Sequence, residues 1–110
     1  MTQLMTERGQ VKPGRYHQET ILTGVTGEWV QIPAMGMKGG SVNCSIIAGA
    51  GTGKVQYTNS PDTDVDADTA NEHDWTLGNV TGSNNDTFDG QISAVRGVSI
   101  SGSIVFEVMI

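Results

Sequence analysis

The sequence contains a single cysteine and no long apolar run. With Cys44 alone among 110 residues, no internal disulfide can form, so the chain has to fold by packing its side chains. No apolar stretch approaches the roughly 18 residues of a membrane-spanning helix, and the N-terminus lacks the charged and then apolar pattern of a secretory signal. We therefore expect no membrane partner and a protein made in a reducing cytoplasm.

Positive charge is also scarce, and it is unevenly distributed. The chain has 6 lysine and arginine residues against 12 acids, and residues 55–95 contain no lysine or arginine at all. Proteins that bind nucleic acid need a basic face that neutralises phosphates and releases counterions. Because most of this chain would repel phosphate, we expect no nucleic-acid partner.

Apolar and polar residues alternate over short stretches, which is typical of half-buried strands. In residues 41–47, Val42, Cys44 and Ile46 share one face, so Cys44 is expected to be a packed, unreactive thiol. Four apolar residues share a face near the C-terminus, in a strand that should be central and buried: Ile104, Phe106, Val108 and Ile110. We predict a first hairpin from 18–25 and 28–33, a second within 41–59, and further strands at 73–78, 91–100 and 103–110.

Helical signals are almost missing, so the expected fold class is all-β. Only residues 62–72 have a composition that allows a helical turn, and residues 79–90 are predicted to be a long turn-rich connection. The strand count of about seven or eight favours an antiparallel β-sandwich or jelly roll.

Residues 1–16 differ from the rest of the chain. They show neither the apolar periodicity of a helix nor that of a strand, and they contain glycine and proline residues that interrupt regular secondary structure. We expect an extended N-terminal arm over residues 1–16, followed by a single sandwich domain over residues 17–110. Half of the basic residues lie in this arm, which predicts that it orders against an acidic or polar surface of another subunit. Flexible methionines in a later loop suit the apolar part of the same contact. The residues predicted to bind this partner are Arg8, Lys12, Arg15, Met35 and Met37.

The stretch AGAGTGKV at residues 48–55 has some features of a phosphate-binding loop. That motif needs a serine or threonine after the lysine and a helix that begins there, but a valine follows Lys54 and a strand pattern continues. We therefore predict no nucleotide cofactor. The glycines are expected to form a tight connection, with positive φ angles at Gly49, Gly51 and Gly53.

Acidic and histidine residues form no complete metal or catalytic pattern. An EF-hand loop starting at Asp62 would need glycine and glutamate where the chain has Ala67 and His73, although a looser calcium site within residues 62–74 stays open. His17 lies far from His73 in the sequence, and no nucleophile motif accompanies either one. We predict no catalytic residue, no metal and no cofactor.

The aromatic residues leave two interpretations open. Trp29 and Trp75, with Tyr16 and Tyr57, would stack on sugars if they lay exposed on a sheet, as in lectin-like sandwiches. The other interpretation is that the two tryptophans pack in the core or at its rim.

Several stretches in order resemble a known group of proteins. They are GEWVQIP, GAGTGKVQYTNSP, VDADTAN, W-x-L-G and ISAVRGVSISGSIVFEV. Together they resemble small all-β virion proteins of tailed bacteriophages, and most of all the jelly-roll cement, or decoration, proteins of short-tailed phage heads. The resemblance covers about residues 17–110 and depends on the order and character of these stretches, not on a single diagnostic motif.

The resemblance implies a non-enzymatic protein that binds the outer surface of an assembled capsid and braces it against packaged DNA. Its partner would be the major capsid protein, and the protein would be a homo-oligomer, with a dimer favoured over a trimer. It would be made in the host cytoplasm and end in the virion. The alternatives are a phage tail or tail-fibre protein, a carbohydrate-binding module, and a small calcium-dependent or metal-dependent enzyme.

Overall fold

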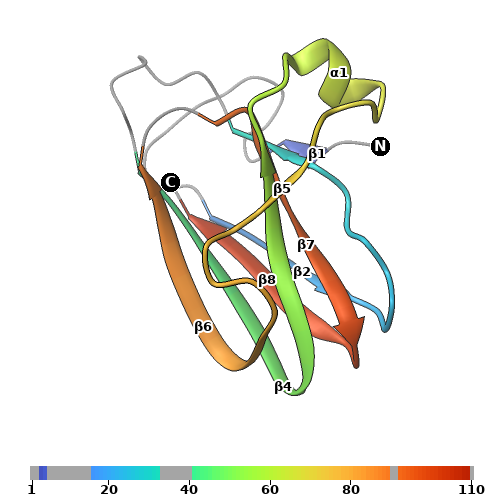
Figure 1. Cartoon of the computed structure of the whole chain (residues 1–110), viewed down its shortest axis with the longest axis vertical. Coiled ribbons are helices and arrows are strands. Elements are labelled where there is room, and N and C mark those ends of the chain that lie inside the picture. Colours follow the sequence, from blue (N-terminus) through green and yellow to red (C-terminus); the bar gives the residue numbers. More distant parts are fainter. Residues whose placement is uncertain (1–2, 5–15, 33–40, 90–91, 110) are drawn as a thin grey trace.

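The strands of the computed structural model form one sheet that folds over into two layers (Figure 1). The structure describes residues 3–4, 16–32, 41–89 and 92–109. In chain order the elements are β1 (Gln3–Leu4), β2 (Tyr16–Ile21), β3 (Val30–Gln31), β4 (Ser41–Thr58), α1 (Asp62–Asp66), β5 (His73–Asp74), β6 (Val80–Asp89), β7 (Ala94–Ser101) and β8 (Ile104–Met109). The predicted all-β sandwich is confirmed.

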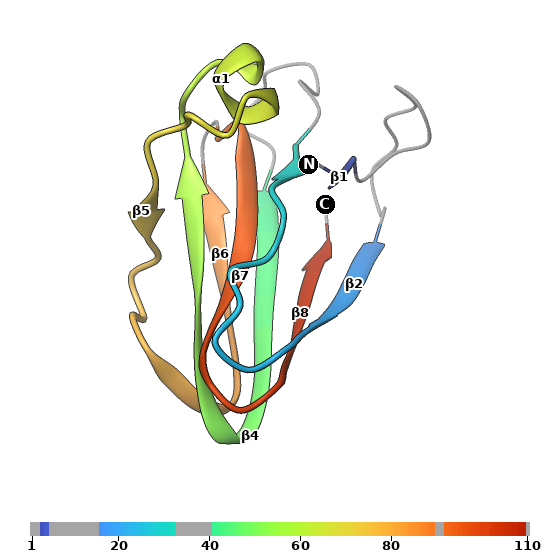
Figure 2. The ribbon, with the colours of Figure 1, turned by 90° about the vertical axis from the view of Figure 1, so that its right-hand side faces the viewer.

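Strand β4 belongs to both layers. Residues 41–47 pair with β6 on one side and β8 on the other, whereas residues 53–58 pair with β7 and, at two positions, with β5. Layer one therefore has the order β6-β4-β8-β2, and layer two has the order β5-β4-β7-β3-β1. Figure 2 shows β4 turning back at the bottom of the view.

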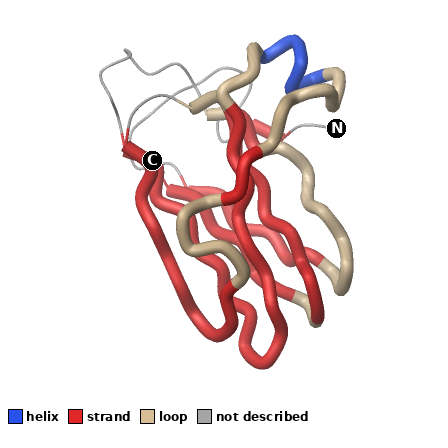
Figure 3. The backbone as a smooth tube through the Cα atoms, in the orientation of Figure 1, coloured by secondary structure: helices blue, strands red, loops and turns tan. Residues whose placement is uncertain are grey.

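The two ends of the sandwich differ. One end holds the start of β2, the end of β8, the start of β7 and the helix α1, and we call it the α1 end. Figure 3 shows α1 in blue at this end. The opposite end holds the bend of β4 and the connection between β7 and β8, and we call it the glycine end.

Apolar residues from both layers meet between them to form the core. Cys44 and Ile46 of β4 are completely buried, as are Phe106 and Val108 of β8, and they pack in one cluster with Val55 of layer two. The predicted faces of 41–47 and of the C-terminal strand are confirmed, and β8 is central because β4 and β2 flank it. Ile110 lies outside the described residues.

Neither predicted hairpin forms. The arms of β4 lie in different layers and pair with other strands, and β2 pairs with β8 while β3 pairs with β7 and β1. Only Gly49 of the three glycines has a positive φ, of 59°. At Gly51 a side chain would meet the carbonyl oxygen of Ser101, so this glycine allows close approach of two backbones.

The prediction of a turn-rich connection over residues 79–90 is wrong, because β6 occupies ten of them. β6 pairs with β4 from Ser41↔Asp89 to Ile47↔Ser83, and the pairing continues past bulges. Its positions facing layer two include glycine, asparagine and aspartate, so the alternation of apolar residues is absent. An edge strand can be this polar because it is covered less completely than a central strand.

The predicted strand 73–78 is shorter than expected. Only β5 is extended, and a turn follows in which the amide of Gly78 donates to the carbonyl of Trp75 at 3.1 Å. The indole Nε1 of Trp75 closes the same turn by donating to the carbonyl of Gly78 at 2.7 Å. The W-x-L-G motif thus builds a turn that lets a loop tryptophan enter the main core.

The helical turn predicted within residues 62–72 is confirmed as α1, which follows Pro61. Its Val65 is buried against Trp29 and Ala94 on the outer side of layer two. No helix among the described residues is long and apolar enough to cross a membrane.

The N-terminal arm is described only at Gln3–Leu4 and Tyr16. Gln3–Leu4 form β1, which runs parallel to β3, and Tyr16 already belongs to β2. Residues 1–2 and 5–15 lie outside the described residues, as do residues 33–40.

Candidate functional site

The segments that hold the predicted partner-binding residues leave the sandwich at one end. The described neighbours of these segments are Leu4 and Tyr16, which flank residues 5–15, and Ile32 and Ser41, which flank the predicted methionine loop, residues 33–40. All four lie at the α1 end, where Leu4 pairs with Gln31, Tyr16 pairs with Met109 and the amide of Ile32 donates to the carbonyl of Ser93. Arg8, Lys12, Arg15, Met35 and Met37 themselves lie outside the described residues.

Two apolar side chains are exposed beside this point. Tyr16 of β2 and Met109 of β8 face each other in the register, and they are 50% and 48% exposed. The Tyr16 hydroxyl donates to Oε2 of Glu107 at 2.6 Å, and this hydrogen bond raises the pKa of the phenol. The pair gives the α1 end an apolar spot next to the arm.

The outward side chains of layer one form three rows, because their strands are in register. The first row is Thr87, Asn43, Met109 and Tyr16; the second is Asn85, Ser45, Glu107 and Gln18; the third is Ser83, Ile47, Val105 and Thr20. We call these twelve side chains the open face, since they are all exposed or half-buried. Glu107 is the one charged residue in the set.

A groove of about 340 Å³ crosses the open face near its glycine end. Its lining residues are Ser45, Ile47, Ser83, Asn84, Asn85 and Glu107. In the second row, the short side chain of Ser45 lies between the longer side chains of Asn85 and Glu107, which all line the groove. Sequence reasoning missed this site, since its residues come from three strands that are distant in the chain.

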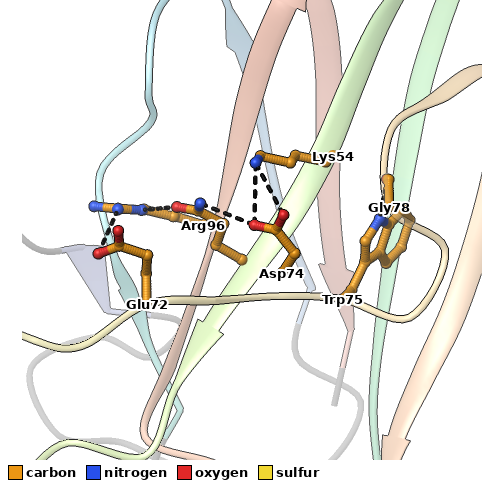
Figure 4. Close-up of polar contacts among 7 residues, drawn as sticks. Lys54, Glu72, Asp74, Trp75, Gly78 and Arg96 are labelled. Carbon is orange, nitrogen blue, oxygen red and sulfur yellow. Dashed lines mark hydrogen bonds and ion pairs between the residues drawn. The ribbon is translucent and has the colours of Figure 1, made fainter.

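The outer side of layer two carries a chain of polar contacts that we call the strap (Figure 4). Lys54 donates to Asp74 at 3.1 Å, and Asp74 also accepts from the amide of Gln56 at 3.1 Å. Gln56 in turn accepts from Nε of Arg96 at 2.9 Å, and Arg96 lies 3.6 Å from Glu72. The strap ties the connection between α1 and β6 to the strands of layer two.

Arg96 is the cation of the strap that lies over an aromatic ring. Its guanidinium lies 4.2 Å from the centre of the Trp29 ring, and its side chain is 19% exposed. Burial lowers the pKa of Arg96, and the acidic neighbours Glu72 and Asp68 partly offset this. Hydrogen bonds from Gln56 and Lys54 lower the pKa of Asp74. These contacts are typical of a structural network, because each charge already has a protein partner.

The residues considered for catalysis do not assemble. His73 stacks near the ring of Tyr57, at 5.4 Å between centroids, while the neighbouring Asp74 bonds to Lys54 and Gln56. His17 contacts Glu19 at 2.9 Å in the other layer. In the described part of the chain, no group of three or more His, Cys, Asp or Glu residues has the arrangement of a metal site.

Acidic residues of the 62–74 run have separate partners. Asp66 accepts from the amide of Gln31 at 2.9 Å, and Asp64 accepts from the hydroxyl of Thr69 at 3.4 Å. Lys54 pairs with Asp74, and it lies within β4, so no helix begins directly after it; α1 starts only at Asp62. Neither the calcium-loop nor the phosphate-loop arrangement is present in these described contacts.

The tryptophans are unavailable for stacking on a sugar. Trp29 and Trp75 are each 2% exposed, so the core interpretation is confirmed for both. Tyr57 is half-buried against Phe88, with ring centroids 5.1 Å apart. Cys44 is buried as predicted, and burial strongly raises the pKa of its thiol.

Comparison with known proteins identifies no family. No family model and no curated protein matches the chain. Among solved structures, it is similar to the capsular polysaccharide assembling protein CapF from Staphylococcus aureus, with 10% identity, a TM-score of 0.45 and coverage of 92% of this chain and 24% of that one. An HTH_3 family transcriptional regulator from Vibrio cholerae has 15% identity and a TM-score of 0.44, with 86% and 40% covered.

A family 29 carbohydrate-binding module is similar over 86% of this chain and 91% of its own, with 9% identity and a TM-score of 0.37. By contrast, the chain covers only about a quarter of the length of the CapF chain and two-fifths of the length of the regulator. At these identities and TM-scores, the likenesses carry no argument about function.

Proposed function

We propose that the chain is a non-enzymatic structural protein of a virion, a decoration protein that binds the outer surface of a phage capsid. The observation that carries this proposal is the convergence at the α1 end. Tyr16, Ile32 and Ser41 all lie there, so the basic arm and the methionine loop both join the sandwich where Tyr16 and Met109 are exposed.

This end combines the two kinds of contact that a protein interface needs. Exposed aromatic and methionine side chains provide apolar contact area, and Met35 and Met37 would extend it. Arg8, Lys12 and Arg15 would provide charge contacts to an acidic or polar surface of the major capsid protein. The body of the chain carries most of the acids and so would be repelled from the same surface.

Repetition would strengthen such a contact. A capsid presents the same surface many times, and a decoration protein that forms a homo-oligomer engages several copies at once. The second and later contacts then form at a high effective concentration, so a weak single contact suffices. We propose a dimer, with a trimer as the alternative state.

The test is co-sedimentation with empty phage heads across a salt series. A variant lacking residues 1–15 should remain folded, because β1 contributes only two residues to the edge of layer two, and it should lose binding. Reversing charge at Arg8, Lys12 and Arg15 should weaken binding more at low salt than at high salt, since exposed charges are screened within about 10 Å at 0.1 M salt.

A matched control adds negative charge at the opposite end. The substitutions Thr23→Glu and Ser103→Glu lie in exposed turns at the glycine end and should leave co-sedimentation unchanged. Full binding by the truncated form would refute the proposed contact. Binding to isolated tails and not to heads would favour the tail protein instead.

A further inference from the structure

The groove on the open face has the chemistry of a small polar ligand site, and the decoration role does not use it. We infer that it binds a neutral hexopyranose, either a single sugar or one residue of an oligosaccharide. Its volume of about 340 Å³ is largely open to solvent, so a ligand would lie on the face of the sheet and would not be enclosed. The inference does not depend on the proposed capsid contact, because the groove is lined from the second and third rows of the open face, whereas the capsid contact uses Tyr16 and Met109 of the first row.

The polar groups around the groove have hydrogen-bonding capacity to spare. Within the described part of the chain, the hydroxyls of Ser45 and Ser83 and the amide of Asn85 bond to no protein group. Oε1 of Glu107 likewise has no partner there, since both contacts to this carboxylate use Oε2. Hydroxyls, an amide and a carboxylate supply both donors and acceptors, which is what the hydroxyls of a sugar require.

Glu107 is held in place before any ligand arrives. The Tyr16 hydroxyl donates to its Oε2 at 2.6 Å, and the Gln18 amide donates to the same oxygen at 3.2 Å. Both residues lie on β2, so the carboxylate is fixed from the side away from the groove. Oε1 is left to accept from a ligand hydroxyl, and fixing the carboxylate beforehand lowers the cost in side-chain entropy.

The charge of the groove selects against other ligands. Glu107 is the one charged side chain on the open face, and the face holds no lysine or arginine. Phosphates, sulfated sugars and uronic acids would meet a carboxylate with no compensating cation, which costs binding energy. A neutral sugar pays no such penalty.

An apolar side chain in the lining adds contact area for a pyranose ring. Ile47 lines the groove and is 39% exposed, and Val105 lies next to it in the third row, outside the lining. A hexopyranose has one face of C–H groups that packs on apolar side chains, while its hydroxyls point to the rim. Because no exposed aromatic ring lines the groove, we expect weak binding, with Kd of about 1 mM.

The experiment is an NMR titration of the full chain, labelled with ¹⁵N, with four neutral sugars and one acidic one. The probes are cellotriose, mannotriose, galactobiose and chitotriose, with trigalacturonate for comparison, each up to 20 mM, which is about 20 times the expected Kd. We expect at least one neutral probe to shift the amide signals of Ser45, Asn85 and Glu107 in a saturable way. Trigalacturonate should bind at least tenfold more weakly than that probe.

Two variants assign the binding to the groove. Ser45→Ile fills the space between Asn85 and Glu107 and should abolish the shifts, and Glu107→Gln should weaken binding about tenfold by removing the charged acceptor, about 1.4 kcal/mol. Thr20→Ile is the matched control, because it makes a similar substitution on the same face outside the groove. It should leave Kd within a factor of two.

Each result of these experiments either supports or overturns the sugar site. No shift with any neutral probe overturns the inference, as does binding that survives Ser45→Ile in a protein whose amide spectrum shows a folded chain. If Ser45→Ile fails to fold, Ser83→Val supplies the same test at the rim of the groove. Heads should still bind Ser45→Ile, so that failure of the sugar site and failure of the capsid contact are told apart.

Discussion

Replacing Arg96 by methionine tests whether the strap holds the outer side of layer two together. Methionine keeps an unbranched apolar stem over Trp29, so the substitution removes the charge and the guanidinium fork with little loss of packing. The hydrogen bond to Gln56, the contact with the Trp29 ring and the ion pair with Glu72 all disappear.

The cost follows from how enclosed each contact is. Gln56 is buried, so losing the partner of its Oε1 costs about 1–3 kcal/mol. A partly desolvated cation over an indole adds about 0.5–2 kcal/mol. Glu72 is about half exposed, so its ion pair contributes about 0–1 kcal/mol. Because these contacts share one side chain and do not simply add, we expect a loss of about 2–3 kcal/mol in the free energy of unfolding.

Lys54→Met is the matched control within the same strap. Lys54 pairs with Asp74, whose side chain is 49% exposed, so this substitution should cost about 0.5–1 kcal/mol. Urea unfolding followed by circular dichroism and by tryptophan fluorescence measures both variants. If Arg96→Met costs no more than Lys54→Met, the buried contacts of Arg96 do not stabilise the fold.

Three further predictions concern the core and the acid stability. The thiol of Cys44 should resist a disulfide reagent at pH 8 until urea unfolds the protein, because burial raises its pKa; rapid labelling of the native state would contradict the position of β4. The pKa of Asp74 is lowered in the folded protein, so its contacts stabilise the fold above about pH 4 and this stabilisation is lost as the pH falls through the pKa of the folded state. Asp74→Asn should therefore make the free energy of unfolding depend less on pH in this acidic range. Gly97→Ala would place a Cβ 2.7 Å from Cδ1 of Ile21 and 2.8 Å from Cβ of Phe106, so we expect it to lower the free energy of unfolding by about 1–3 kcal/mol. Ile21→Val removes the first of these contacts and leaves the second, so it should restore only part of the loss. A thermal melt of the single and double variants checks the last of these.

The faces of the central strands could be predicted because burial on one side imposes an alternation. Cys44 and Ile46 in β4, like Phe106 and Val108 in β8, point inward at every second position. A slip of one residue would turn each of these side chains to the solvent, so the sequence has to keep the period. The fold class followed from such patterns.

The pairing of the strands could not be predicted in the same way. A hairpin is the local solution when two strand patterns flank a glycine run, yet the glycines here carry β4 from one layer to the other. At Gly51 the reason for glycine is the backbone of Ser101, which is remote in the sequence. Such close approaches are invisible until the partner strand is known.

The edge strand β6 was missed for a different reason. The alternation of apolar and polar residues can be recognised in a sequence only where the inward positions are apolar. In β6 the half-buried inward positions include Asn84 and Asp86, so no alternation is visible. The groove was missed with it, since Ser83 and Asn85 line it from this strand. The sequence could indicate that the arm is basic. That the arm and the methionine loop join the sandwich at the same end could be seen only from the register of the strands around Tyr16 and Ser41.

The two outer sides of the sandwich differ because β4 gives each a different chemistry. Its second half presents Lys54 and Gln56, which bind the connection between α1 and β6 and so commit the side of layer two to internal contacts. Its first half presents Asn43 and Ser45 in rows that stay exposed or half-buried. Charge follows the same division, since the strap contains four ionised side chains and the open face contains one, at Glu107. Surface residues that have no internal partner remain free to contact another molecule. Substitutions in the strap should therefore change stability and leave binding unaffected, whereas those at the α1 end or in the groove should do the reverse.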